Sequence, residues 1–68
     1  MDIKKRVGRN LQHYRKKKGF SQEELGFECN LHRTYISGIE RGIRNPTVLI
    51  IANLAKALSI KPSQLLEE

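Results

Sequence analysis

The chain has 68 residues, of which 38% are hydrophobic and 6% aromatic, and Lys and Arg outnumber Asp and Glu by 13 to 7. A chain this short buries only about 60% of its unfolded surface. We therefore expect one domain over residues 1–68, without a large cavity and without a small-molecule ligand. Its longest apolar run, Val48–Ala52, is far below the ~20 residues that span a bilayer, and Cys29 is its only cysteine. With no signal-peptide pattern at its start, we expect a cytoplasmic protein without membrane contact.

The first predicted helix runs from Ile3 to about Lys18 and carries most of the positive charge. Its apolar residues recur at steps of four, four and three and form one stripe of an amphipathic helix: Ile3, Val7, Leu11 and Tyr14. Residues 1–18 hold eight Lys or Arg against Asp2 alone, whereas the remaining residues are nearly balanced in charge. Such a basic segment favours polyanionic partners, and Gly19 after the basic last turn is typical of a helix C-terminus.

The second predicted helix follows the stretch "FSQEEL". Ser21 can cap it and Glu24, three residues later, can reach back to close a capping box, while Phe20 and Leu25 form a hydrophobic staple. We expect this helix to run from Gln22 to about Cys29. It should end at Asn30, a residue that tolerates the left-handed conformation of a tight turn.

The third predicted helix lies in "HRTYISGIERG", which spans His32–Gly42. Ile36 and Ile39 are three residues apart and share an inward face, whereas Arg33, Ser37 and Arg41 follow another face beside Thr34 and Gly38. Glycine in a helix costs roughly 1 kcal/mol relative to Ala, so we expect Gly38 to give clearance to a DNA backbone or a neighbouring helix. Gly42 ends the helix.

The remaining chain predicts two more helices after the loop "IRNP". Thr47 can cap a fourth helix that continues to about Leu58, with a core stripe that includes Val48, Ile51 and Leu54. Pro62 can then open a short fifth helix that holds Leu65 and Leu66. The sequence therefore predicts an all-α fold of five short helices.

The second and third predicted helices, joined by a tight turn, have the order of a helix-turn-helix. Over residues 6–66 the chain resembles the phage-repressor and Cro (Xre-type) family of DNA-binding domains, in residues that lie along the whole stretch: Gln22, Glu24, Leu25, Ile36, Glu40, Gly42, "LAKAL" and the later "LL". The resemblance implies a lambda-repressor-like domain. From the residues themselves we expect no catalytic activity, metal or cofactor, because His13 and His32 have no arranged Ser, Cys or carboxylate partner and the chain has neither zinc-ligand spacing nor a Gly-rich phosphate loop. Within the family, "RTYISGIERGIRNPT" is most similar to controller proteins of restriction-modification systems, although other regulators carry similar strings.

What the resemblance implies for DNA contacts falls on the third helix and its surroundings. Arg33, Thr34 and Ser37 are expected to contact base edges in a major groove, because Arg fits guanine and the Thr methyl fits thymine. The expected phosphate or groove contacts are Gln22, His32, Tyr35, Arg41, Arg44, Asn45 and Arg15. His32 stands where the family often has Ser or Asp, so weaker capping is expected there. The alternatives are a solvated helix face for Arg33 and Thr34, and half-buried packing for Tyr35.

The resemblance also implies structural contacts between subunits and within the chain. Arg15 and Glu40 match positions that form a partly buried ion pair between the first and third helices. Leu49 and Ile50 are apolar where the family commonly has polar residues, which suggests a subunit interface that Asn53 and Leu66 complete. The prediction is a two-fold homodimer that places two recognition helices about 34 Å apart on a pseudo-palindromic operator in double-stranded DNA.

Two other function classes and one further partner stay open at this point. An antitoxin-like adaptor would bind a partner protein through a tail, which the chain is not expected to have, since it ends at Glu68. Non-specific binding to nucleic acid such as RNA would use the basic first helix. Glu23 and Glu28 either form a solvated acidic face or contact RNA polymerase, so activation and repression of transcription are both compatible with the sequence.

Overall fold

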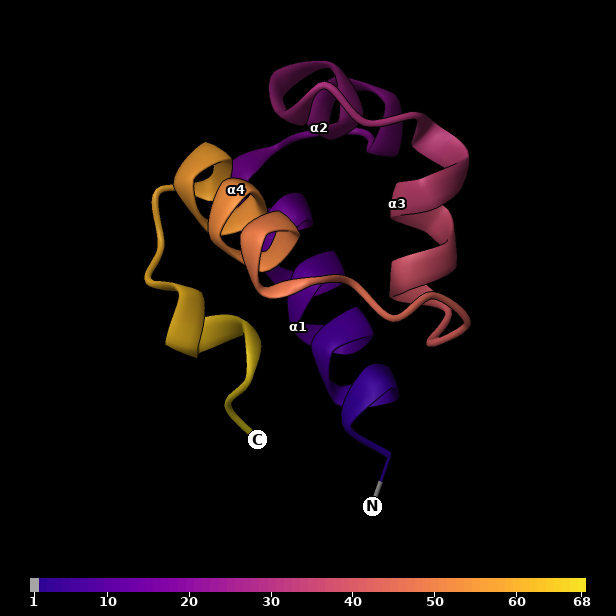
Figure 1. Cartoon of the computed structure of the whole chain (residues 1–68). Coiled ribbons are helices and arrows are strands. Elements are labelled where there is room, and N and C mark those ends of the chain that lie inside the picture. Colours follow the sequence, from indigo (N-terminus) through magenta and orange to yellow (C-terminus); the bar gives the residue numbers. More distant parts are fainter. Residues whose placement is uncertain (1) are drawn as a thin grey trace.

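The computed structural model describes residues 2–68, which fold into four α-helices and one 3₁₀ helix (Figure 1). The elements are α1 Ile3–Lys18, α2 Gln22–Cys29, α3 Arg33–Glu40, α4 Val48–Leu58 and the 3₁₀ helix η1 Pro62–Leu65. No strand is present in the described part of the chain, which confirms the all-α prediction. The fifth element differs from its prediction, because only four residues follow the Lys61 cap in 3₁₀ geometry and Leu66 lies outside it.

Local side-chain chemistry sets the ends of the helices. The capping box of α2 is complete, since the Ser21 backbone N–H donates to Glu24 Oε1 at 2.8 Å and the Glu24 N–H donates to Ser21 Oγ at 3.0 Å. Asn30 ends the same helix in the left-handed region at φ 57°. The cap of α1 is Asp2, whose carboxylate accepts from the Lys4 N–H at 3.0 Å, a role that was not predicted for it.

The core lies where the inward faces of all five elements meet. Its largest fully buried side chains are Leu11, Leu25, Ile36, Ile39, Leu54 and Leu65. Val48 was predicted to join the core stripe of α4, and this was wrong, because Val48 is 84% exposed. It occupies the first turn of α4 at the edge of the domain, and the buried stripe starts one turn later at Ile51.

Close packing of α1 against α3 places the third helix on the body of the domain. A Cβ atom on Gly8 would lie less than 3 Å from the carbonyl oxygens of Ile39 and Glu40, so the two helix backbones approach to a distance that only glycine allows. In the first half of α1, Arg6 and Asn10 donate hydrogen bonds to backbone carbonyls of the C-terminal segment, Leu65, Leu66 and Glu67. Within residues 2–68, no helix is long and apolar enough to cross a membrane.

Candidate nucleic-acid interface

The turn between α2 and α3 fixes where the third helix begins. After the left-handed Asn30, the Leu31 N–H donates to the Gly26 carbonyl at 2.8 Å and returns the chain toward α2. His32 then caps α3, since its Nδ1 accepts from the Thr34 N–H at 3.1 Å and lies 2.8 Å from Thr34 Oγ1. The imidazole nitrogen thus takes the place of the Ser or Asp oxygen that the family often has at this cap.

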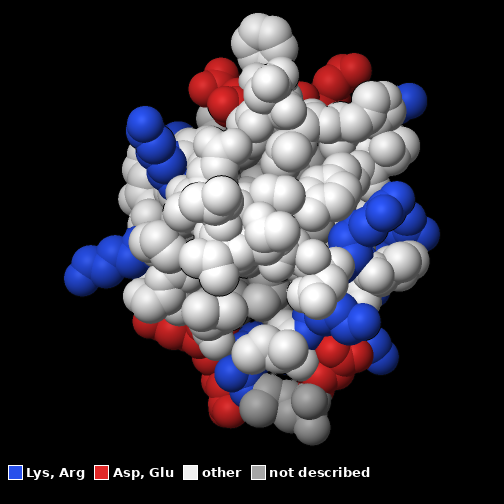
Figure 2. Space-filling view, in the orientation of Figure 1, with Lys and Arg blue, Asp and Glu red and all other residues white. Residues whose placement is uncertain are grey.

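One face of α3 packs on the core of the domain, and the other is exposed to solvent. Ile36 and Ile39 are fully buried, whereas Arg33 and Thr34 in the first turn are exposed and Ser37 is half-buried. Arg33, Arg41 and Arg44 are exposed on α3 and in the following residues, and Figure 2 shows blue side chains on that side of the molecule as well as on the opposite side, with red acidic groups at the α2 end and at the bottom. The exposed side of α3 is thus a cationic surface, which suits a polyanionic ligand.

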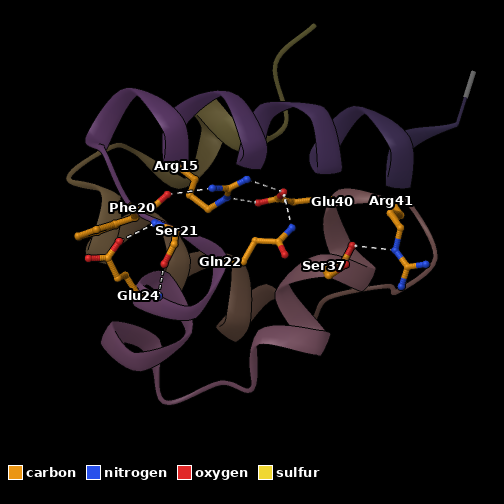
Figure 3. A network of polar contacts seen from close by, with 8 residues as sticks. All are labelled: Arg15, Phe20, Ser21, Gln22, Glu24, Ser37, Glu40 and Arg41. Carbon is orange, nitrogen blue, oxygen red and sulfur yellow. Dashed lines mark hydrogen bonds and ion pairs between the residues drawn. The ribbon is translucent and has the colours of Figure 1, made fainter.

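A buried polar network holds α3 against α1 and α2 (Figure 3). Arg15 donates to Glu40 from Nε at 2.6 Å and from Nη2 at 3.1 Å. Its Nη1 donates to the Phe20 carbonyl at 2.8 Å, and the Gln22 amide donates to Glu40 Oε1 at 3.0 Å. The predicted ion pair is present, with side-chain exposures of 9% and 3% for Arg15 and Glu40.

Burial of this network decides between the two roles considered for Arg15. The residue is 7% exposed and its guanidinium points toward Glu40 and the Phe20 carbonyl inside the domain. Its expected phosphate contact is therefore wrong, since the donors that would face a phosphate are turned inward. Gln22, by contrast, is half-buried and braces Glu40 at the first turn of α2.

The loop after α3 folds back onto the helix. The backbone N–H groups of Ile43 and Arg44 donate to the Gly38 carbonyl at 2.9 and 3.1 Å. The Arg44 guanidinium carbon lies 5.8 Å from the centroid of the half-buried Tyr35 ring, within cation–π range. A Cβ on Gly38 would lie 2.5 Å from Arg44 Cγ. The clearance at Gly38 is thus filled by a side chain of the same chain, not by a neighbouring helix.

The remaining predicted contacts next to α3 are exposed. The Arg41 Nε donates to the Ser37 carbonyl at 3.4 Å, which aligns its side chain along the end of the helix (Figure 3). Asn45 is exposed in the loop between Arg44 and Pro46. Together with Arg33 and Arg44, these residues border the outer face of α3.

A second, apolar surface covers α4 and the C-terminal segment. Leu49 is 81% exposed and Leu66 is 44% exposed, as an interface would require, and Val48, which was predicted in the core, is exposed beside Leu49. Val48 and Leu66 border a groove of about 320 Å³ between the start of α1, the loop before α4, and η1, with mainly apolar walls that include Ile3, Val7, Pro46 and Ile51. Figure 2 shows an uncharged area over α4 in this region.

Two of the predicted interface residues serve the chain's own fold. Ile50 is half-buried against the core, because it is on the flank of α4 that faces the domain. Asn53 donates from its amide to the Cys29 carbonyl at 3.0 Å and so closes the end of α2 against α4. Both residues thus contribute to the chain's own fold, while Asn53 is exposed and Ile50 is half-buried, so their predicted place in a subunit contact stays a prediction.

Cys29 is a packing residue at the end of α2. It is 3% exposed, and burial, followed by the nearby charge of Glu28, raises the pKa of its thiol above the ordinary value of 9.0. A thiol with a raised pKa is a weak nucleophile and a weak metal ligand at neutral pH. No group of three His, Cys, Asp or Glu that could hold a metal ion is found in residues 2–68.

Known proteins of similar sequence are regulators. A family model described as Helix-turn-helix matches residues 11–65. The control protein C.BamHI of Bacillus amyloliquefaciens is 55% identical over 51 residues, which are 75% of this chain and 63% of that protein, just under two thirds of its length. The control protein C.SmaI of Serratia marcescens is 44% identical over 66 residues, which are 97% of this chain and 79% of that protein.

Solved structures of the same architecture extend this similarity. The restriction-modification controller protein C.AhdI from Aeromonas hydrophila matches with a TM-score of 0.88 at 44% identity, over 91% of this chain and 90% of that chain. SinR, the master regulator for biofilm formation, was solved in complex with DNA and matches with a TM-score of 0.85 at 31% identity, over 90% of this chain and 98% of that chain. The chain therefore belongs to the helix-turn-helix family of DNA-binding transcription regulators, within which it is similar to the restriction-modification controller proteins.

Proposed function

We propose that this protein is the controller of a restriction-modification system, a cytoplasmic and non-enzymatic regulator that binds a pseudo-palindromic operator as a homodimer. The observation that carries the proposal is the position of α3. Two buried isoleucines and the Arg15–Glu40 network fix one side of this helix, while Arg33 and Thr34 are exposed on the other. A rigid helix with polar groups in its first exposed turn is what major-groove recognition requires.

Base contacts follow from the chemistry of the exposed face. Arg33 can donate two hydrogen bonds to the O6 and N7 atoms of guanine. The Thr34 hydroxyl is already bonded to His32, which leaves its methyl group to contact thymine, and Ser37 lies one turn further along the helix. Phosphate and groove contacts are assigned to the residues that surround this face: Gln22, His32, Tyr35, Arg41, Arg44 and Asn45.

The homodimer is assigned to the apolar surface over α4 and the C-terminal segment. Val48, which lines the apolar groove, and the neighbouring Leu49 are both more than 80% exposed, and exposed apolar clusters of this kind commonly mark contacts between proteins. Sedimentation of the wild type should give a dimer, and Leu49→Glu should shift it to the monomer. Phe27→Glu is the matched control, since Phe27 is 84% exposed on α2, away from this surface. A wild-type monomer at micromolar concentration would contradict the assignment.

Selection of bound duplexes from a random pool tests specificity and symmetry together. We expect an inverted repeat whose half-sites are one helical turn, about 34 Å, apart. Arg33→Ala should then weaken binding by about 1–3 kcal/mol, mainly at one base pair of each half-site. Lys56→Ala is the control because it removes one exposed positive charge on α4. An equal small loss on all sequences, or equal binding of single-stranded RNA, would indicate charge-driven binding instead.

Transcription activation through RNA polymerase is assigned to α2. Glu23 and Glu28 are exposed on this helix, and their charge is opposite to that of the α3 surface, so DNA would not cover them. Replacing both with Gln should reduce activated transcription in a purified system while operator affinity stays the same. Unchanged activation by the double variant would contradict the assignment of this contact to Glu23 and Glu28.

A further inference from the structure

Gly38 and Arg44 form an interlocking pair at the edge of the exposed α3 face. The Gly38 carbonyl accepts hydrogen bonds from the N–H groups of Ile43 and Arg44, so the loop backbone is tied to the helix at this residue. The Arg44 stem then passes over the bare Gly38 backbone. A Cβ on Gly38 would lie 2.5 Å from Arg44 Cγ, 3.5 Å from its Nε and 3.6 Å from its Cβ.

Tyr35 holds the other end of the same side chain. The Arg44 guanidinium carbon is 5.8 Å from the Tyr35 ring centroid, and Tyr35 precedes Gly38 by three residues, so both lie on one side of α3. Arg44 remains exposed as a residue, which leaves the guanidinium accessible to solvent and to a ligand. Its stem and its planar head are thus both positioned before any ligand binds.

We propose that Gly38 and Tyr35 are positioning residues that form a seat for Arg44 and hold its guanidinium ready for a DNA phosphate beside the recognition helix. An unseated arginine side chain must lose its rotamer freedom when it binds, which costs affinity, whereas a seated one has lost that freedom on folding. The effect on DNA binding rests on the proposed function, but the seat itself belongs to the free protein. Separate experiments can therefore refute the seat of Arg44 and its effect on DNA binding.

A double-mutant cycle with the selected operator duplex tests the effect on binding. Gly38→Ala forces Arg44 to move, so we expect affinity to fall about 3- to 10-fold, the range for one side chain that has to be ordered on binding. Arg44→Ala should lower affinity by at least as much. In the Arg44→Ala background, Gly38→Ala should then change nothing. An equal loss from Gly38→Ala in both backgrounds, or no loss in the wild type, would overturn the proposal.

The seat can be observed in the free protein by NMR. The Tyr35 ring current should shift the Arg44 side-chain protons away from their ordinary values, and Tyr35→Leu and Gly38→Ala should each remove most of that shift. Arg41, which bonds to the Ser37 carbonyl, is the matched control and should keep its shifts. Ordinary Arg44 shifts in the wild type would refute the seat. A seated Arg44 whose removal does not affect duplex binding would refute the proposed role of this surface in DNA binding instead.

Discussion

Replacing Glu40 with Gln probes the network that fixes the recognition helix. The change keeps the size of the side chain but removes the charge that Arg15 contacts at 2.6 and 3.1 Å. Arg15 is 7% exposed, so water cannot solvate the guanidinium once its partner is neutral. Breaking a buried pair costs about 3–5 kcal/mol. Since the Phe20 carbonyl and the new amide oxygen still accept hydrogen bonds, we expect about 3 kcal/mol, the lower end of this range.

This loss is large for so small a domain. At roughly 0.05–0.15 kcal/mol per residue, the whole chain has a free energy of unfolding of about 3–10 kcal/mol. The midpoint of thermal unfolding should fall by at least about 12 °C, because 1 kcal/mol corresponds to about 4–8 °C in a domain of this size. Urea and thermal unfolding followed by far-UV circular dichroism measure both quantities.

Glu68→Gln is the matched control for this experiment. It makes the same chemical change in the Arg6–Glu68 pair, whose atoms are 3.0 Å apart but whose Glu68 side chain is 80% exposed, so we expect less than about 1 kcal/mol. Equal effects of the two variants would refute the argument from burial. If Glu40→Gln does not fold, the double variant Arg15→Met with Glu40→Leu should fold, since apolar residues of similar volume often replace a buried pair without loss.

Two further predictions concern packing and pH. Gly8→Ala should lower the free energy of unfolding by about 1–3 kcal/mol in urea, because its Cβ meets fixed carbonyl oxygens, whereas Gly38→Ala meets a movable side chain and should not destabilise the fold. Burial raises the pKa of Cys29, so the folded state holds the thiol proton more tightly than the unfolded chain does. The stability that the folded chain gains from this difference is fully present below the ordinary pKa of 9.0 and is lost as the pH rises above that value. Stability measured from pH ~8 upward should therefore decline less in Cys29→Ala, and an equal decline would contradict the assignment.

Local signals were sufficient to predict the helix boundaries. The capping pair Ser21 and Glu24, the left-handed Asn30 and the cap Thr47 lie within three residues of the helix ends they control. Such contacts depend on neighbouring residues only, and for that reason the sequence reports them directly. Asp2 is a local signal of the same kind, because it directly precedes the apolar stripe of α1 and caps that helix, but its capping role was not predicted.

Burial at the edges of the domain could not be predicted in the same way. Val48 and Ile51 share one stripe of α4, yet only Ile51 has the core beneath it. Ile50 differs from its prediction in the opposite direction, since it was predicted to be exposed but packs partly buried against the core. Helical periodicity gives the direction of a side chain, whereas the length of the opposing surface decides whether it is covered.

The sequence by itself determined the helical fold, the helix-turn-helix order and the display of Arg33 and Thr34, because each follows from local periodicity, capping and motif spacing. Tertiary structure decided which of the long side chains are turned inward and which stay available to a ligand. Arg15 faces a buried carboxylate and not a phosphate, and Arg44 lies on the bare backbone of Gly38. These choices join residues far apart in sequence or on opposite sides of a turn, and they depend on the space that the packed helices leave between them.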